Sequence, residues 1–341
     1  MNRPRQTSEE SAAASGLAAS RPRASWGRYA NRLGPLIGLA VVFALFAARV
    51  PDSFLTLTNF ETMARQTAIV GIAALGMTLV IVSGGIDLSA GSVIALCSVV
   101  VATLVKTGVA PLYAALGGVA AGALCGLANG ILITRLRVVP FIVTLGTMLI
   151  VRGAAKGIAH EQTVNPDADT WLNTLTASLG PGQKWMIVPP GVWIMILLAL
   201  LVAGALRYTR LGRHTFAIGS NEQTAQLCGV RVNRVKILLY TLCAAFAGLA
   251  GVMQFSRLTL GDPTAAVGME LNVIAAVVIG GGSLSGGEGS VLGTLVGALI
   301  MTVIDAGCSH MSLANWVQEI ATGVIIVLAV ALDRFRRRQA G

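Results

Sequence analysis

Long apolar runs recur along almost the whole of this 341-residue chain. A run of about 17–25 apolar residues is long enough, as a helix, to cross a hydrocarbon core roughly 30 Å thick. Hydrophobic residues make up 55% of the chain and charged residues 12%, so a water-soluble fold could not cover that much apolar surface. We expect an all-α, polytopic membrane protein of about ten transmembrane helices. The expected spans lie near 33–50, 62–82, 89–106, 111–133, 139–156, 190–207, 235–256, 270–282, 289–307 and 314–332.

The positive charge is concentrated outside these spans. The net charge is +10, and most of the 25 Lys and Arg residues lie before residue 33, around Arg135, between 207 and 236, and after residue 333. Basic residues collect on the cytoplasmic side of membrane helices. The distribution therefore predicts that both termini are cytoplasmic in a bacterial inner membrane, and it argues against nucleic-acid binding.

This topology divides the chain into one membrane domain and two tails. The domain covers 33–333, with the polar and more acidic loop 157–189 outside and the basic loop 207–236 in the cytoplasm. The tail 1–32, rich in Ala, Ser and Arg, is expected to be disordered. The basic tail 334–341 follows the last span.

Two glycine-rich stretches interrupt the apolar pattern: "VSGGIDLSAGSVIAL" (82–96) and "IGGGSLSGGEGSVLG" (279–293). They share an order of residue types and form a faint internal repeat. Paired glycine-broken segments in two halves of a transporter indicate a translocation site, because non-helical backbone at membrane depth must line a cavity or be buried in protein. Two ordinary tight turns would give the same pattern. A stretch that enters and leaves by one face would lower the number of spans.

The second stretch contains "LSGGE", one residue from the signature of ATP-binding cassette (ABC) ATPases. An ATPase also needs the phosphate-binding loop GxxxxGK[ST], which the chain lacks. The five cysteines show no CxxC spacing and the three histidines are scattered, so no metal or cofactor is expected. The pattern also indicates no nucleophile and base for a membrane-bound enzyme.

Three stretches together resemble the ribose-type permease subunits of bacterial ABC sugar importers. They are 75–96, with the hallmark "GGIDLS"; 209–240, with "IGSNEQTAQLCGV"; and 269–300, with "MELNVIAA". The resemblance extends from about residue 36 to 333. It implies that two such permeases, alike or different, form a pore for a pentose or hexose. ABC ATPase subunits would drive it and a periplasmic solute-binding protein would deliver the sugar.

The resemblance also identifies the loop 207–236 as the segment that couples to the ATPase. This loop is too long for a turn and too polar to be buried, so we expect a short helix parallel to the membrane, capped by Ser220 or Asn221 with Glu222 in its first turn. A solvated loop that merely holds positive charge is the alternative. The expected coupling residues are Arg213, Asn221, Glu222 and Gly229.

Asp87 is the main candidate among ionisable residues within the spans, which are costly and usually functional. It could cap the following helix together with Ser89, or accept hydrogen bonds from sugar hydroxyls. Glu270, which the resemblance favours, is expected at the external gate or at the face that docks the binding protein. An ion-coupled secondary transporter with Asp87 as coupling carboxylate is the rival interpretation. The expected pathway or pore-shaping residues are Gly84, Gly85, Asp87, Ser89, Glu270, Gly281 and Gly282.

Overall fold

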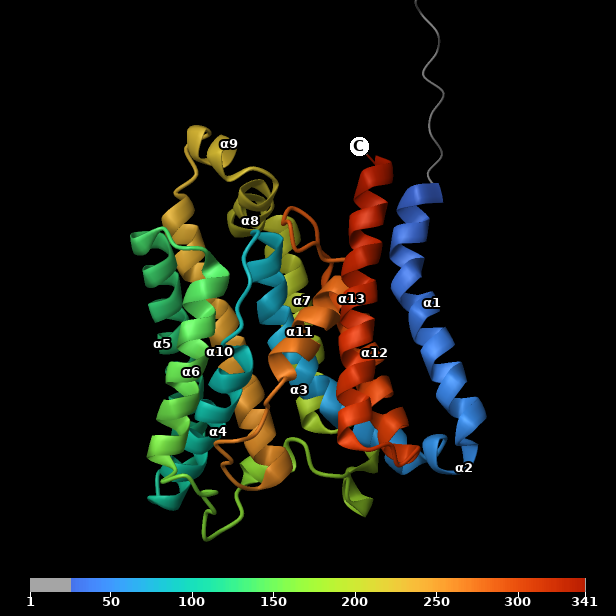
Figure 1. Cartoon of the computed structure of the whole chain (residues 1–341). Helices are drawn as coiled ribbons and strands as arrows, with labels where there is room; N and C mark the ends of the chain where they lie inside the picture. The colour runs from blue at the N-terminus through green and yellow to red at the C-terminus, as the bar shows by residue number, and fades with distance from the viewer. Residues whose placement is uncertain (1–25, 341) are drawn as a thin grey trace, which may run out of the picture.

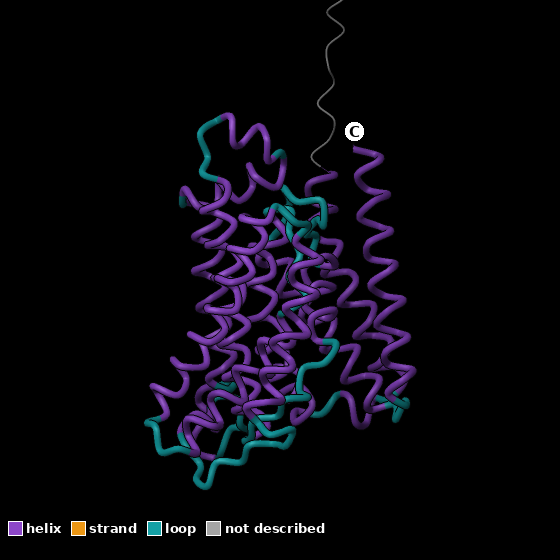
Figure 2. The backbone as a smooth tube through the Cα atoms, turned by 60° about the vertical axis from the view of Figure 1, so that its left-hand side comes forward, coloured by secondary structure: helices purple, strands orange, loops and turns teal. Residues whose placement is uncertain are grey.

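The computed structural model describes residues 26–340, and within this range the chain is a bundle of helices (Figure 1). Apart from one antiparallel bridge between Val164 and Gly261, the described range contains no β-structure, which confirms the expected all-α class. Most loops lie at the two ends of the bundle (Figure 2). The helices are α1 (Trp26–Arg49), α2 (Pro51–Phe54), α3 (Leu57–Val82), α4 (Ala90–Lys106), α5 (Pro111–Leu136), α6 (Pro140–Ile158), α7 (Pro190–Tyr208), α8 (Arg210–Ser220), α9 (Glu222–Leu227), α10 (Val232–Leu258), α11 (Met269–Ile279), α12 (Val291–His310) and α13 (Asn315–Ala340), with short 3₁₀ turns at Trp171–Thr174 and Pro181–Met186.

Six of the described helices are long and apolar enough to cross a membrane: α3, α5, α6, α7, α10 and α12. Four shorter apolar helical segments, Gly34–Arg49, Ala90–Lys106, Met269–Ile279 and Trp316–Leu328, coincide with the other four expected spans. Proline opens α5, α6 and α7, where its missing N–H costs no hydrogen bond. The expected spans are therefore helical, while their total of about ten stays a prediction.

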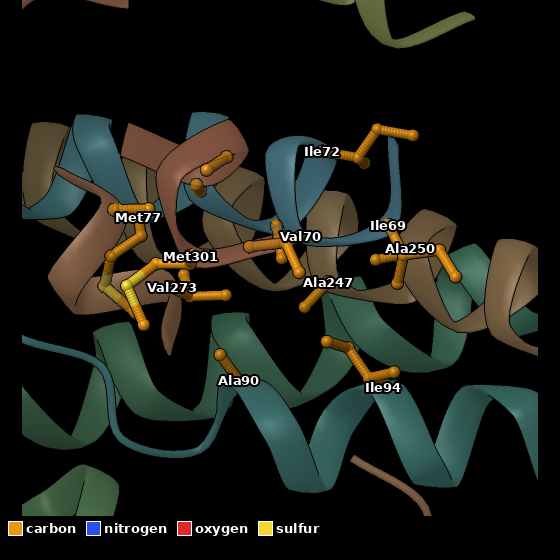
Figure 3. Close-up of a cluster of buried hydrophobic side chains, with 14 of the residues drawn as sticks. Ile69, Val70, Ile72, Met77, Ala90, Ile94, Ala247, Ala250, Val273 and Met301 are labelled. Carbon is orange, nitrogen blue, oxygen red and sulfur yellow. The ribbon is translucent and has the colours of Figure 1, made fainter. Parts of the chain in front are cut away.

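The centre of the bundle is α3, which is apolar all round and almost wholly enclosed. Ile69, Ile72 and Met77 of this helix are fully buried. Side chains from α4, α10, α11 and α12 pack around them in one cluster, seen in Figure 3. The exposed large apolar side chains lie mainly on α1, α5, α6, α7 and α13, the outer helices. The central position of α3 agrees with its sequence, because a helix that is apolar on every side must be buried.

Helices α5 and α10 approach each other at backbone distance. Three glycines spaced four residues apart on α5 face this contact, and a Cβ added at each would meet the α10 backbone: Gly122 the carbonyl of Ala244, Gly126 that of Tyr240, and Gly130 the Cα of Ile237. Small residues at this spacing let membrane helices pack closely. This contact fixes α10 against α5.

Two helices, α4 and α11, begin inside the bundle (Figure 1). The segment 83–89 leaves the end of α3 in extended form and descends to the start of α4, while 259–268 rises from the end of α10 to the start of α11. At about 1.5 Å per residue, the 11-residue α11 is roughly 16 Å long, about half a membrane core. The 17-residue α4 is longer, about 26 Å, and the N-termini of both helices lie within the protein.

The beginning of α1, the end of α13, and α8 and α9 lie at one end of the bundle, and 159–189 lies at the other (Figure 1). We call them the loop end and the far end. The expected tail 1–32 lies mostly outside the described residues, and its last part, 26–32, is the start of α1. No proline lies in this part of the chain before Pro35, so the helix extends beyond the apolar run.

Candidate functional site

Asp87 lies in the extended segment that leads to α4, and it is only 1% exposed. Its Oδ1 accepts hydrogen bonds from the Ser89 backbone nitrogen at 2.9 Å and from the Ser89 Oγ at 2.6 Å. The carboxylate thus holds the turn just before α4, close to the capping role expected from the sequence. Ser89 is the N-cap residue, but its side chain forms no capping bond to the helix. Asp87 Oδ2 has no hydrogen-bond partner among the described residues.

Asn129 of α5 fixes this turn from the side. Its Nδ2 donates to Ser89 Oγ at 3.0 Å, and the residue is fully buried beside the glycine contact of α5 with α10. The Tyr240 hydroxyl of α10 donates to the Ile86 carbonyl at 3.4 Å. The entry to α4 is therefore tied to both α5 and α10.

Glu270 lies in the first turn of α11 and meets the first turn of α4. A Cβ added at Gly91 would collide with Glu270 Oε2 and would lie 2.6 Å from the Ala266 carbonyl oxygen. Glu270 Oε2 is buried, and within the described part of the chain it has no hydrogen-bond partner. The starts of α4 and α11 therefore meet, with a carboxylate between them. We call Asp87, Ser89, Gly91, Asn129 and Glu270 the central junction.

The segment that carries Glu270 into place is held from two other helices. Arg152 of α6 donates from Nη1 to the carbonyls of Pro263 at 3.0 Å and Ala265 at 2.6 Å. Val164, in the loop after α6, exchanges backbone hydrogen bonds of 2.8 and 2.9 Å with Gly261. These bonds satisfy backbone groups that no helix satisfies, as burial requires.

A second meeting point lies at the loop end, where three segments touch through their backbones. The Gly287 nitrogen donates to the Val82 carbonyl, the last residue of α3, at 2.9 Å. A Cβ at Gly219, near the end of α8, would collide with that same carbonyl and with the Gly287 nitrogen. A Cβ at Gly286 would lie 2.9 Å from the Cα atoms of both Gly219 and Gly84. We call Val82, Gly84, Gly219, Gly286 and Gly287 the glycine junction.

The expected coupling loop folds as two helices, α8 and α9, at the loop end (Figure 1). Asn221 is the N-cap of α9, and its Oδ1 accepts from the Thr224 nitrogen at 2.8 Å. Glu222 occupies the first turn. This confirms the predicted cap and acidic first turn, although Ser220, the alternative cap, ends α8 instead.

The surface of α9 is open to solvent. Ala225 is its one buried residue, and the apolar Leu227 at its end is 88% exposed. Arg213 on α8 and Gly229 after α9 are exposed as well. Glu222 pairs with Lys236 of α10 at 2.7 Å, so α9 is anchored to α10 by charge.

The structure divides the expected pathway residues into two groups. Asp87, Ser89 and Glu270 belong to the central junction, and Gly85 lies in the same segment as Asp87, against the Tyr240 hydroxyl. Gly84, Gly281 and Gly282 lie at the loop end, in the turns after α3 and α11. The two glycine-rich stretches end α3 and α11 with the same turn, in which the Gly85 nitrogen donates to the Val80 carbonyl at 3.0 Å and the Gly282 nitrogen to the Val277 carbonyl at 2.8 Å. The repeat is therefore visible as two equivalent helix ends, and its role in a translocation site stays a prediction.

Sequence reasoning missed Asn129, Arg152, Gly219 and Lys236. Each acts on a partner far away in the sequence, with Asn129 contacting Ser89 and Lys236 contacting Glu222. One signal in the sequence indicated Asn129: it is an amide residue on an apolar helix, among glycines spaced four residues apart. An intramembrane polar residue is a functional candidate by default.

Comparison with known proteins identifies the chain's relatives. The family described as "Branched-chain amino acid transport system / permease component" matches residues 59–330. The ribose import permease of Escherichia coli (strain K12) is 41% identical over 298 residues, which cover 87% of this chain and 92% of that protein. An L-arabinose ABC transporter permease of Azospirillum brasilense is 38% identical over 336 residues, covering 98% and 96%. The ribose import permease of Bacillus subtilis (strain 168) is 39% identical over 304 residues, covering 89% and 93%. No solved structure matches.

Proposed function

Since this chain belongs to the family of permease components defined by that match, we propose that it is the permease subunit of an ATP-driven ABC importer for a monosaccharide. Relatives named for ribose and for L-arabinose import, each aligned over most of its length, carry this proposal. They favour a pentose as the substrate class. They give no support to the rival interpretation, an ion-coupled carrier.

The protein is a multi-pass membrane protein, in keeping with its relatives and its six long apolar helices. We propose ten spans, with α4 and α11 each counted together with the segment that leads into it. Both termini would lie in the cytoplasm. The basic loop end, which carries the beginning of α1, the end of α13, α8 and α9, supports this orientation.

The energy would come from an ATPase on a separate chain that contacts α8 and α9. The exposed surface of α9, with Leu227 at its end, is suited to enter a cleft in a partner. Movement of α8 would be passed on through the glycine junction, because Gly219 touches both the end of α3 and the turn before α12. Arg213, Asn221, Glu222 and Gly229 are the coupling residues of this proposal.

The translocation pathway would run past the central junction. Extended backbone at membrane depth, flanked by half-helix termini, is typical of solute sites in transporters. We propose that Gly85, Asp87, Ser89 and Glu270 shape this part of the pathway, and that Gly84, Gly281 and Gly282 shape its loop end. A second permease copy would complete the pore, and a periplasmic binding protein would supply the sugar.

Affinity purification tests the proposal directly. The tagged chain is extracted in mild detergent, and the proteins that accompany it are identified by mass spectrometry. Recovery of an ABC ATPase, together with ATP-dependent uptake of D-ribose or L-arabinose after reconstitution with the binding protein encoded nearby, is the expected result. A chain that is recovered alone and moves solute in liposomes without ATP would contradict it.

A further inference from the structure

Two helix N-termini converge at the central junction, and each carries a positive electrostatic potential. An N-terminus behaves as about half a positive elementary charge, because its first N–H groups lack partners within the helix. The starts of α4 and α11 lie within contact distance, as the approach of Ala266 and Glu270 to Gly91 requires. Together they amount to about one positive charge inside the bundle.

A site of this kind binds anions readily. In transporters with broken helices, half-helix N-termini point at the anionic groups of substrates. Arg152 adds further positive potential, since its guanidinium binds the carbonyls of Pro263 and Ala265 and its charge interacts with that of Glu270. Without a compensating group, the junction would attract anions from the pathway.

The chain places two of its own carboxylates at these helix starts. Asp87 accepts the Ser89 backbone N–H just before α4, and Glu270 lies between α4 and α11. Glu270 Oε2 lies against the Cα of Gly91, where only a residue without Cβ leaves room for it. Two other buried oxygens of the α4 entry, Asp87 Oδ2 and Ser92 Oγ, have no hydrogen-bond partner in the described part of the chain. Both residues are 1% exposed, so the junction contains buried oxygens whose hydrogen-bonding positions the described residues do not use.

We propose that Glu270 is the charge-selecting residue of this permease. Its carboxylate occupies the anion position between α4 and α11, so that uncharged polyhydroxy solutes pass the junction while anions are excluded. Sugar hydroxyl groups can form hydrogen bonds with the remaining buried oxygens. A sugar acid or sugar phosphate instead meets the negative charge of Glu270, which already occupies the anion position. This inference rests on the proposed permease function.

The test uses the complete transporter, with its ATPase and binding protein, in proteoliposomes that take up the neutral sugar identified by the reconstitution above. Sulfate is the probe, because a small inorganic anion does not need to be recognised by the binding protein. Glu270→Gln removes the carboxylate that lies between the two helix starts and leaves Asp87 as the other, so the sulfate concentration that halves uptake should fall by about tenfold relative to the unaltered protein. Glu319→Gln, which removes an exposed acid from α13, is the control for net charge and should match the unaltered protein.

The outcomes separate this inference from the proposed function. If the unaltered transporter shows no ATP-driven uptake, the proposed function fails. If it does, and Glu270→Gln takes up sugar with unchanged resistance to sulfate, the charge-selecting role is wrong. Should Glu270→Gln not assemble with the ATPase, Gly91→Ala is measured instead, since its Cβ displaces the carboxylate without removing it. Uptake by that variant should also become sensitive to sulfate, and unchanged resistance would overturn the inference.

Discussion

The glycine junction and the central junction both join segments that are distant in sequence, but they do so by opposite means. At the glycine junction, α3, α8 and the turn before α12 touch backbone to backbone, with one 2.9 Å hydrogen bond between Gly287 and Val82. At the central junction, side chains form the contacts, from Asn129 through Ser89 to Asp87. Glu270 adds a buried carboxylate there.

The difference indicates how a movement could pass through the molecule. A contact made by backbone alone has no rotamer to change, so the three segments must shift together or separate. The central junction has spare polar atoms and extended backbone, so it can exchange partners as a solute passes. The first junction is thus suited to transmit force, and the second to respond to the solute.

The largest effect is expected at the glycine junction. Gly219→Val introduces a side chain where even a Cβ overlaps the Val82 carbonyl, so overpacking should cost about 1–3 kcal/mol of stability. ATP-driven uptake should fall close to background, because α8 no longer seats on α3. Thermal unfolding in detergent and uptake in proteoliposomes measure the two effects. Normal uptake by this variant would show that force does not pass through Gly219.

A smaller effect is expected at the central junction. Asn129→Leu keeps the volume but removes the donor to Ser89 Oγ, which should cost about 1 kcal/mol and lower maximal uptake several-fold. Thr134→Val on the same helix is the matched control, because its hydroxyl bonds the Gly130 carbonyl of its own helix at 2.7 Å. If both variants lower uptake equally, the junction has no special role.

The ion pair between Glu222 and Lys236 should matter for coupling more than for stability. It is partly exposed, so Lys236→Ala should change stability by less than about 1 kcal/mol. Sugar transported per ATP hydrolysed should nevertheless fall, because α9 loses its anchor on α10. The exchanged pair Glu222→Lys with Lys236→Glu should recover part of this ratio. An exchanged pair as poorly coupled as the single variant would assign the effect to Lys236 alone.

The smallest effect is expected at Gly204 of α7, where an added Cβ meets no atom within 4 Å. Gly204→Ala should leave uptake unchanged and should raise helix stability by up to about 1 kcal/mol. Comparison of Gly204→Ala with Gly219→Val separates the effect of replacing a glycine from the effect of disrupting a close backbone contact. Reduced uptake in Gly204→Ala would weaken the comparison.

The elements that local patterns determine were predictable from the sequence. Apolar runs located α1, α3 to α7 and α10 to α13, and the Asn221 cap followed from residue types that compete for free helical amides. The short α2 was not predicted, and the loop 207–236 holds two helices where one was expected. The direction of the segments was harder to predict. Nothing in "TLGDPTAAVG" (259–268) distinguishes a segment that rises into the bundle from an ordinary loop at the far end.

Contacts across the bundle account for most of what was missed. Gly219 looks like any helix-ending glycine until α3 and the turn before α12 are brought beside it. Glu270 could be assigned to a membrane helix, but its position at the start of α4 depends on how 259–268 packs along that helix. A glycine-rich repeat indicates that the backbone can adopt conformations and close contacts that other residues prevent. Only the tertiary structure shows which of these each glycine makes.

The most direct test of the central claim uses Cys228, the residue that follows α9. It is exposed, while Cys97, Cys243 and Cys308 are buried and Cys125 is half-buried. A photoreactive maleimide attached to Cys228 in the transporting complex should, on illumination, form an adduct with the ABC ATPase, and Cys228→Ser should abolish it. A complex that takes up sugar with ATP while Cys228 never crosslinks to the ATPase would contradict the claim that α8 and α9 receive the driving force.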